Sequence, residues 1–181
     1  MSSMFKLSLL ALTGSVLFTG CVSTPSQIEN KKTVTINAVS ANGIDAKIGS
    51  IELQDSAAGL VIKTNLNNLP SGPHGFHIHE NGSCEPAEKD GKLGAALSAG
   101  GHYNPLKVGN HGNPLTGHMG DLPLLNVEND GTAKVSLLAP RLKLQDIQGL
   151  AVMIHAGSDN YSDDPKPLGG GGDRIACGVI Q

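Results

Sequence analysis

Two histidines flank a single apolar residue in the stretch Gly75-Phe76-His77-Ile78-His79. If this stretch is a β-strand, alternate side chains point to opposite faces, so His77 and His79 share one face. Positions two apart lie roughly 6.6 Å apart along a strand, close enough for two imidazoles to bind one metal ion. The H-x-H pattern is weak evidence on its own, because two unrelated surface histidines produce it as well.

Further candidate ligands occur later in the chain, which has seven histidines in all. Three lie in a polar segment that also carries Asp121, and a fourth ends a later apolar run; they are His102, His111, His118 and His155. A set of histidines with one carboxylate suits tetrahedral zinc, and an all-histidine set suits copper. Histidines on a polar loop can instead be solvated side chains, which would explain one or two of these.

The elements that must position these side chains are predicted to be short strands. The chain has 181 residues, 24 of them glycine, with 3% aromatic residues and no tryptophan. Glycine costs about 1 kcal/mol in a helix interior, so this composition disfavours a helical bundle. Alternating polar and apolar residues between turn residues predict seven strands, at 33–38, 47–53, 60–66, 75–79, 133–138, 150–155 and 175–180. Many short strands without a long helix indicate an all-β antiparallel sandwich or barrel.

Two long segments interrupt this series of strands, at residues 80–125 and 156–174. Irregular segments of this length are uncommon in compact domains and are usually functional. We expect bound metal and a disulfide to order them. The net charge is only -3, and no basic run alternates with aromatic residues, which argues against a nucleic-acid partner.

The first twenty residues have the features of an export signal. Lys6 precedes an apolar run from Leu7 to Phe18, which is too short to span a bilayer as a stable helix. Thr19-Gly20-Cys21 follows, and small residues before a cysteine are typical of a bacterial lipoprotein signal, whose cysteine is lipidated. An ordinary secretory signal cleaved nearby is the alternative. We therefore predict a signal peptide at 1–20, a polar tether at 21–32 and a folded domain at 33–181. The protein is expected to be exported to the periplasm and anchored there to a membrane by lipid.

The three cysteines fit export to an oxidising compartment. If Cys21 carries lipid, Cys84 and Cys177 remain and are predicted to form a disulfide. Two unrelated buried thiols are the alternative.

Several strings of residues occur in an order that is characteristic of one family. They are Gly-Phe-His-Ile-His-Glu at 75–80, Gly-Gly-His-Tyr-Asn-Pro at 100–105, Gly-His-Met-Gly-Asp-Leu-Pro at 117–123, His155, and the segment 169–180 with its glycine run and Cys177. From about Lys32 to its end, the sequence resembles the Cu,Zn superoxide dismutases, and Pro-Leu-Gly-Gly-Gly-Gly at 167–172 resembles their bacterial, periplasmic branch. The resemblance implies a Greek-key β-sandwich or barrel, an architecture for which this family is a known example.

The resemblance also implies the ligands of two metal ions. Copper would be bound by His77, His79, His102 and His155. Zinc would be bound by His102, His111, His118 and Asp121. His102 would bridge the two ions, because a histidine has two separate ligand nitrogens. The remaining histidine, His74, matches a structural residue of the family.

The implied activity is the conversion of superoxide to oxygen and hydrogen peroxide by redox cycling of copper, with His102 and Arg174 as the catalytic residues. Zinc has no redox chemistry and would hold His102. Arg174 matches the arginine that lies beside copper in the family, although a surface salt bridge is its other interpretation. We expect Asp163, or else Asp159, to orient the ligand histidines. Lys89 and Lys92 are candidates for attracting the anionic substrate, or are ordinary solvated lysines.

Two other functions remain open at this stage. One is a copper-binding or chaperone-type module of the same fold without turnover, which would tolerate loss of Arg174 and of the bridging histidine. The other is a copper-only dismutase, which would lack the zinc ligands and the second long loop. The sequence does not distinguish a monomer from a homodimer.

Overall fold

The computed structural model describes residues 30–181. Cys21 and the predicted signal peptide therefore lie outside the described residues, as does most of the predicted tether. Among residues 30–181, no helix has the length and apolar character needed to cross a bilayer.

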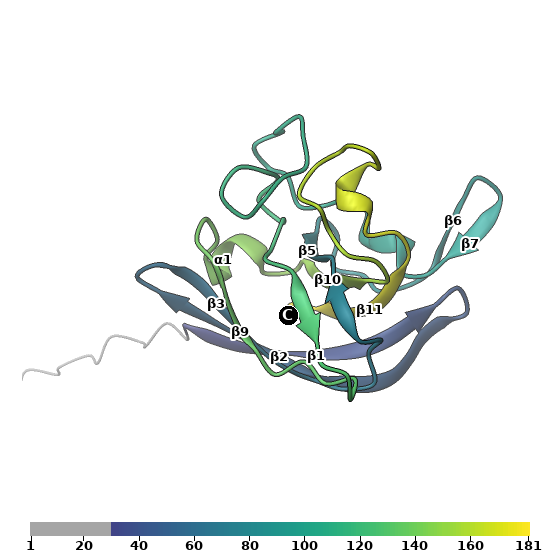
Figure 1. The fold of residues 1–181 in the computed structure, drawn as a ribbon, viewed down its shortest axis with the longest axis horizontal. Helices are drawn as coiled ribbons and strands as arrows, with labels where there is room; N and C mark the ends of the chain where they lie inside the picture. Colours follow the sequence, from purple (N-terminus) through teal and green to yellow (C-terminus); the bar gives the residue numbers. More distant parts are fainter. Residues whose placement is uncertain (1–29) are drawn as a thin grey trace, which may run out of the picture.

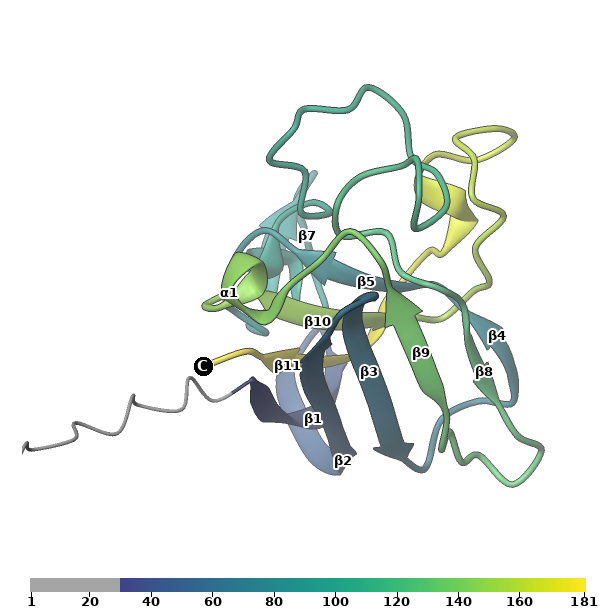
Figure 2. The same cartoon turned by 90° about the vertical axis from the view of Figure 1, so that its left-hand side faces the viewer.

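Seven strands form one curled antiparallel sheet, in the order β5-β10-β11-β1-β2-β3-β9 (Figures 1 and 2). Their bounds are Lys31–Ser40 (β1), Gly43–Ser56 (β2), Gly59–Leu66 (β3), Phe76–His79 (β5), Ser136–Ala139 (β9), Ala151–His155 (β10) and Arg174–Val179 (β11). Each corresponds to one of the seven predicted strands, so the all-β antiparallel prediction is confirmed. Strand β1 begins two residues before the predicted domain boundary, because Lys31 and Lys32 pair with the end of β2.

The remaining elements are short. Strands β4 (Gly72–His74) and β8 (Leu125–Val127) pair with each other, and so do β6 (Ala87–Lys89) and β7 (Lys92–Gly94). Three helical turns complete the fold: η1 (Leu97–Ala99), α1 (Leu144–Ile147) and η2 (Leu168–Gly170). Strands of three residues are too short to show an alternating pattern, which is why the sequence did not predict β4, β6, β7 or β8.

The sheet buries apolar side chains on two sides. The inner cluster holds most of the large residues, including Ile36, Ile51, Leu53, Ile62 and Phe76. A smaller cluster on the opposite face includes Ala151, Met153, Cys84 and Cys177. Side chains alternate between faces along each strand, so residues on this second face lie outside the main core and under the long loops.

The predicted disulfide is present between Cys84 and Cys177, whose Cα atoms lie 5.7 Å apart. It joins the first long loop to β11 across 93 residues of sequence. In the chain-entropy model, closing a loop of this length stabilises the fold by roughly 4–5 kcal/mol. The disulfide thus restrains the loop that carries four of the candidate ligands.

The two long loops lie side by side above β5 and β10, as both views show (Figures 1 and 2). Several hydrogen bonds connect them, two of which are donated by backbone N–H groups of the first loop to side chains of the second. The backbone N–H of His111 donates to Oδ2 of Asp163 over 2.8 Å, and the N–H of Leu124 donates to the hydroxyl of Tyr161 over 2.9 Å. The loops therefore form one continuous cover over the face of the sheet that carries His77 and His79.

Candidate metal centre

Strand β5 presents its two histidines as the alternation predicts. Phe76 and Ile78 pack in the inner core, while His77 and His79 lie on the opposite face beneath the loops. The two rings are almost completely buried, with their centroids 6.4 Å apart. These are therefore not surface histidines.

His155 lies at the end of β10, next to β5 in the sheet. Its N–H donates to the carbonyl of Gly75 over 2.9 Å, and its register partner in β11 is Arg174. The register shifts between Ile154 and His155, and an irregularity of this kind re-aims the side chain that follows it. The sheet thus brings His155 beside the histidines of β5 and sets Arg174 next to it.

The four predicted copper ligands meet at one point. One ring nitrogen from each of four buried side chains lies within 4.8 Å of the others: His77, His79, His102 and His155. The Nε2 atoms of His79 and His155 are 3.3 Å apart. An all-imidazole set of this size suits copper.

The predicted zinc ligands gather around the carboxylate of Asp121. Its oxygens lie 3.0 Å from Nδ1 of His102, 3.1 Å from Nδ1 of His111 and 3.5 Å from Nδ1 of His118. Asp121 and these histidines are all buried. Three imidazoles with one carboxylate suit tetrahedral zinc.

His102 belongs to both sets. Its Nδ1 faces Asp121, and its ring also contributes to the group formed with His79 and His155. His77 is also a member of the compact group formed with His102, His111 and Asp121, in which it stands in place of His118, and its ring stacks on that of His102 with centroids 3.9 Å apart. However, Nε2 of His77 is bonded to Asp159, so His77 has one free nitrogen and can serve only one ion.

The fit of these residues to two metal ions rests on their unsatisfied atoms. Within residues 30–181, three buried side-chain nitrogens have no hydrogen-bond partner: Nδ1 of His77, of His111 and of His118. A buried polar atom without a partner is costly, and all three belong to predicted ligands. Nδ1 of His111 is 3.1 Å from Asp121 without hydrogen-bond geometry, as expected for two atoms that point at a shared ion.

The carboxylate of Asp159 connects a predicted copper ligand, His77, to a predicted zinc ligand, His111. Its Oδ2 accepts from Nε2 of His77 and its Oδ1 from Nε2 of His111, each over 2.8 Å. Asp163, the first of the two predicted candidates, accepts instead from the backbone N–H groups of His111 and Leu168. The order of the two candidates is therefore reversed, because only Asp159 contacts the rings of ligand histidines.

A glycine makes this arrangement possible. Gly169 has a positive φ of 71°, and a side chain there would overlap the carboxylate of Asp159 and approach Nε2 of His111. The second long loop can place its backbone against Asp159 only because this position has no Cβ. Gly169 thus allows the backbone of the second long loop to pack directly against Asp159 and His111.

Burial keeps most of these imidazoles neutral. It lowers the pKa of His77 to about 3 and that of His155 to about 4, and it lowers the pKa of His79 well below its usual value. A neutral imidazole has the free electron pair that a metal ion needs.

His111 differs from these histidines in that its pKa is raised and not lowered. Burial alone would lower its pKa, but the carboxylates of Asp121 and Asp159 outweigh burial and raise the pKa to about 9. Burial would likewise raise the pKa of Asp121, yet its histidine and backbone partners hold that pKa well below its usual range. Carboxylates that attract a proton to this position would attract a divalent cation as well.

Comparison with known proteins decides the family. Residues 47–180 match the family model described as copper/zinc superoxide dismutase. The chain is 50% identical to superoxide dismutase [Cu-Zn] of Escherichia coli (strain K12), over 98% of both chains. The Cu/Zn superoxide dismutase structure from Brucella abortus aligns with a TM-score of 0.82 and 47% identity, covering 83% of this chain and 99% of that one. The solution structure of the monomeric copper, zinc superoxide dismutase from Salmonella enterica gives 0.76 and 52%, with the same coverage.

The chain belongs to the copper/zinc superoxide dismutase family. The resemblance inferred from its motifs is thereby confirmed, together with the two cofactors that it implied, copper and zinc.

In this dismutase fold, Arg174 is tied to the loop that carries His102. Its guanidinium donates to the carbonyls of Ala96 and Gly100. Nδ1 of His79 lies 3.0 Å from the same Gly100 carbonyl. One backbone carbonyl therefore connects the arginine to a predicted copper ligand. Among residues 30–181, the guanidinium bonds to main-chain carbonyls and forms no salt bridge.

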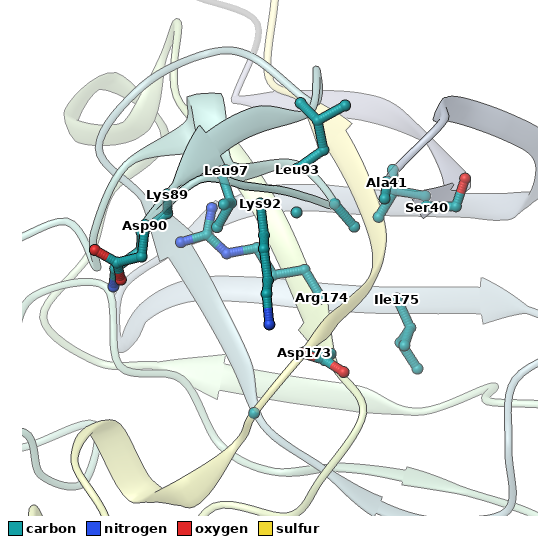
Figure 3. Close-up of a pocket in the computed structure, with 14 residues that line it drawn as sticks. Ser40, Ala41, Lys89, Asp90, Lys92, Leu93, Leu97, Asp173, Arg174 and Ile175 are labelled. Atoms are coloured by element: carbon teal, nitrogen blue, oxygen red, sulfur yellow. The ribbon is translucent and has the colours of Figure 1, made fainter.

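Arg174 also lines a pocket between the β6–β7 hairpin, the β1–β2 turn and the start of β11 (Figure 3). Lys89 and Lys92 line the same pocket, with Asp90 and Asp173 as the opposing charges. The pocket measures about 750 Å³, far more than a diatomic anion fills, so its charge rather than its size would favour such an anion. The structure brings together the three cations proposed to attract substrate.

His74 lies apart from the dismutase ligand groups. Its Nδ1 is 2.7 Å from the carbonyl of His155, and its Nε2 is 2.8 Å from that of Pro70. Through the carbonyl of His155 it contacts the end of β10, in keeping with the structural role predicted for it.

Proposed function

We propose that this chain converts superoxide to oxygen and hydrogen peroxide. Copper would be held by His77, His79, His102 and His155, and zinc by His102, His111, His118 and Asp121. The observation that carries the proposal is the position of His102, whose Nδ1 lies 3.0 Å from Asp121 while its ring also belongs to the group with His77, His79 and His155. When bound, copper supplies one-electron redox cycling, whereas zinc is redox-inert and polarises the ring that it shares.

The chain's own hydrogen bonds select the ring nitrogen that each ligand offers. His79 and His155 place Nδ1 against the carbonyls of Gly100 and Gly172, so Nδ1 carries the proton and Nε2 has the free pair. His77 has the opposite tautomer, because its Nε2–H donates to Asp159 and leaves Nδ1 free. These contacts fix the tautomer before any ion arrives.

His102 can also hold a proton during turnover. Its Nδ1 is held on the side of Asp121, so Nε2 is the nitrogen on the copper side. When Nε2 is not bound to copper, it is the basic atom nearest the reaction and can carry a proton toward product. Arg174 stays charged at any working pH and offers a rigid set of donors to a small anion.

The direct test is catalysed decay of a superoxide pulse by the purified, metal-loaded protein. We expect fast decay with wild type and loss of most of it in His155→Ala, which removes one copper donor. Copper binding by wild type without any catalysed decay would contradict the proposal.

Neither alternative function is favoured. A binding module without turnover would not require Arg174 beside the ligand group, and a copper-only dismutase would not require the donors around Asp121. Both features are in place.

We also propose that Asp159 positions the ligands of both ions. Asp159→Asn leaves one oxygen for two imidazole N–H groups, so we expect copper and zinc affinity to fall by about 10- to 100-fold. Competition against a chelator of known affinity measures each ion separately.

Asp163→Asn is the matched control, since its oxygens accept only from backbone N–H groups. We expect its metal affinities to change by less than about 10-fold. A larger loss in Asp163→Asn than in Asp159→Asn would restore the original ranking of the two aspartates.

We further propose that the protein is exported to the periplasm and anchored by lipid on Cys21. The predicted division into a signal peptide at 1–20, a tether at 21–32 and a dismutase domain at 33–181 supports this. Strand β1 begins at Lys31, within two residues of the predicted domain boundary. The anchor would then lie outside the fold.

Replacing the lipidated cysteine tests this directly. We expect Cys21→Ser to move the protein from the membrane to the soluble fraction with its specific activity unchanged, because no ligand lies near that segment of sequence. Fractionation of cells with activity assays on each fraction provides the measurement. A wild-type protein found wholly in the soluble fraction would contradict the lipid anchor.

A further inference from the structure

Arg141 contacts the loop that carries the zinc donors, although it lies far from that loop in sequence. It follows β9 in the connection to α1, and its side chain is partly buried. Its guanidinium makes three hydrogen bonds to main-chain carbonyls: Nε–H to Pro114 over 2.7 Å, and Nη2 to Gly117 over 2.9 Å and to His118 over 2.7 Å. All three acceptors lie within the five residues that end at His118.

These carbonyls depend on Arg141. Among residues 30–181, no other donor bonds to the carbonyls of Pro114 and Gly117, and the carbonyl of His118 otherwise accepts only a longer bond of 3.2 Å from the N–H of Asp121. Buried main-chain groups need partners. Without Arg141, this turn would have to reorient its carbonyls toward water.

The opposite side of the same turn is held by Asp121. Its Oδ2 accepts from the N–H of His118 over 2.8 Å and from the N–H of Gly112 over 3.0 Å. A Cβ on Gly117 would overlap that carboxylate, so the backbone packs directly against it. The Gly117–His118 segment is therefore clamped between Arg141 and Asp121, and rotation of either peptide would displace a zinc donor.

We propose that Arg141 is a positioning residue for the zinc site, holding the backbone of His118 in the orientation that ligation requires. This inference rests on the proposed function, in which His118 and Asp121 bind zinc. A nearby cation repels a divalent ion, so the contribution of Arg141 lies in its donors and not in its charge. The planar guanidinium offers several donors at fixed angles, whereas a lysine offers a single flexible head.

The test compares zinc and copper affinity, by chelator competition, in Arg141→Met, Arg141→Lys and Lys143→Met. Lys143 is the matched control, because it is a cation of the same connection that donates to the carbonyl of Ser56 and does not touch the zinc loop. We expect zinc affinity to fall about 10- to 100-fold in Arg141→Met, with copper affinity within about 3-fold of wild type. Arg141→Lys should recover only part of the loss, and Lys143→Met should match wild type.

Cobalt(II) loaded in place of zinc adds a readout of geometry. Its visible absorption should change in both Arg141 variants and not in Lys143→Met. If Arg141→Met does not fold, Arg141→Lys decides the question alone, since wild-type zinc affinity and cobalt spectrum in that variant overturn the proposal.

The variant His118→Ala separates failure of the zinc site from failure of the role of Arg141. If wild type binds zinc tightly and His118→Ala weakens it, the zinc site stands. Unchanged zinc affinity in both Arg141 variants would then overturn only the role of Arg141. If His118→Ala binds zinc as tightly as wild type, the zinc ligation in the proposed function is wrong, and the role of Arg141 is overturned with it.

Discussion

Replacing His102 with alanine is expected to weaken copper and zinc binding together. Nδ1 of His102 lies against Asp121 while its ring also belongs to the copper group, whereas Nε2 of His77 is bonded to Asp159. Loss of His102 therefore removes a ligand from each group. Loss of an outer-shell partner already costs 10- to 100-fold in affinity, and we expect the loss of a ligand to exceed about 100-fold for each ion. Elemental analysis and chelator competition on the purified variant provide the measurement.

His111→Ala is the matched comparison, because it removes one zinc donor and leaves the copper set complete. We expect a large loss of zinc with copper affinity much closer to wild type. The shared ligand would be refuted if the His102 variant kept full zinc content and normal copper spectra.

Reversing the charge of Arg174 is expected to have the second large effect. The substrate is a small anion, and the local field at the mouth of a site can change encounter rates by 10- to 1000-fold. Arg174 shares its pocket with Lys89 and Lys92, so Arg174→Glu places a negative charge among the cations. We expect activity to fall on the order of 10- to 1000-fold, with copper and zinc still bound after loading with excess metal, because Arg174 is not itself a ligand.

The salt dependence of the rate separates charge from structure. Screening slows an attractive encounter and relieves a repulsive one, so added salt should slow wild type and speed Arg174→Glu. Arg174→Lys keeps the charge without the planar fork and should lose less than about 10-fold. Lys134→Glu, at an exposed position outside the pocket, controls for net charge. Wild-type activity of Arg174→Glu at low salt, or loss of activity matched by loss of copper, would contradict this role.

The strands and the ligand-bearing strand ends were predictable because they follow simple periodicities. Alternation along β5 determines that His77 and His79 face one side while Phe76 and Ile78 fill the core. For β5, a local pattern and the burial of one face are enough. Strand β2 was predicted at 47–53 but extends from Gly43 to Ser56, because its ends continue the pairing with β1, as in Ser40 with Gly43.

Loop contacts were not predictable in this way, because an irregular backbone has no period. Asp159 and Asp163 lie four residues apart in the same loop, and nothing in their spacing indicates that only Asp159 meets His77 and His111. Arg141 carried no signal at all, since its role depends on three carbonyls that only the folded loop brings together. Which residues lie next to the metal donors is decided by the tertiary arrangement of the two loops.

Titration of the metal-free protein with copper, in the presence of one equivalent of zinc, tests the central claim most directly. Superoxide dismutase activity and copper occupancy are followed in the same samples. We expect activity to rise in proportion to bound copper and to stop rising at one copper per chain. Copper that fills the site without producing activity, or full activity before any copper is added, would contradict it.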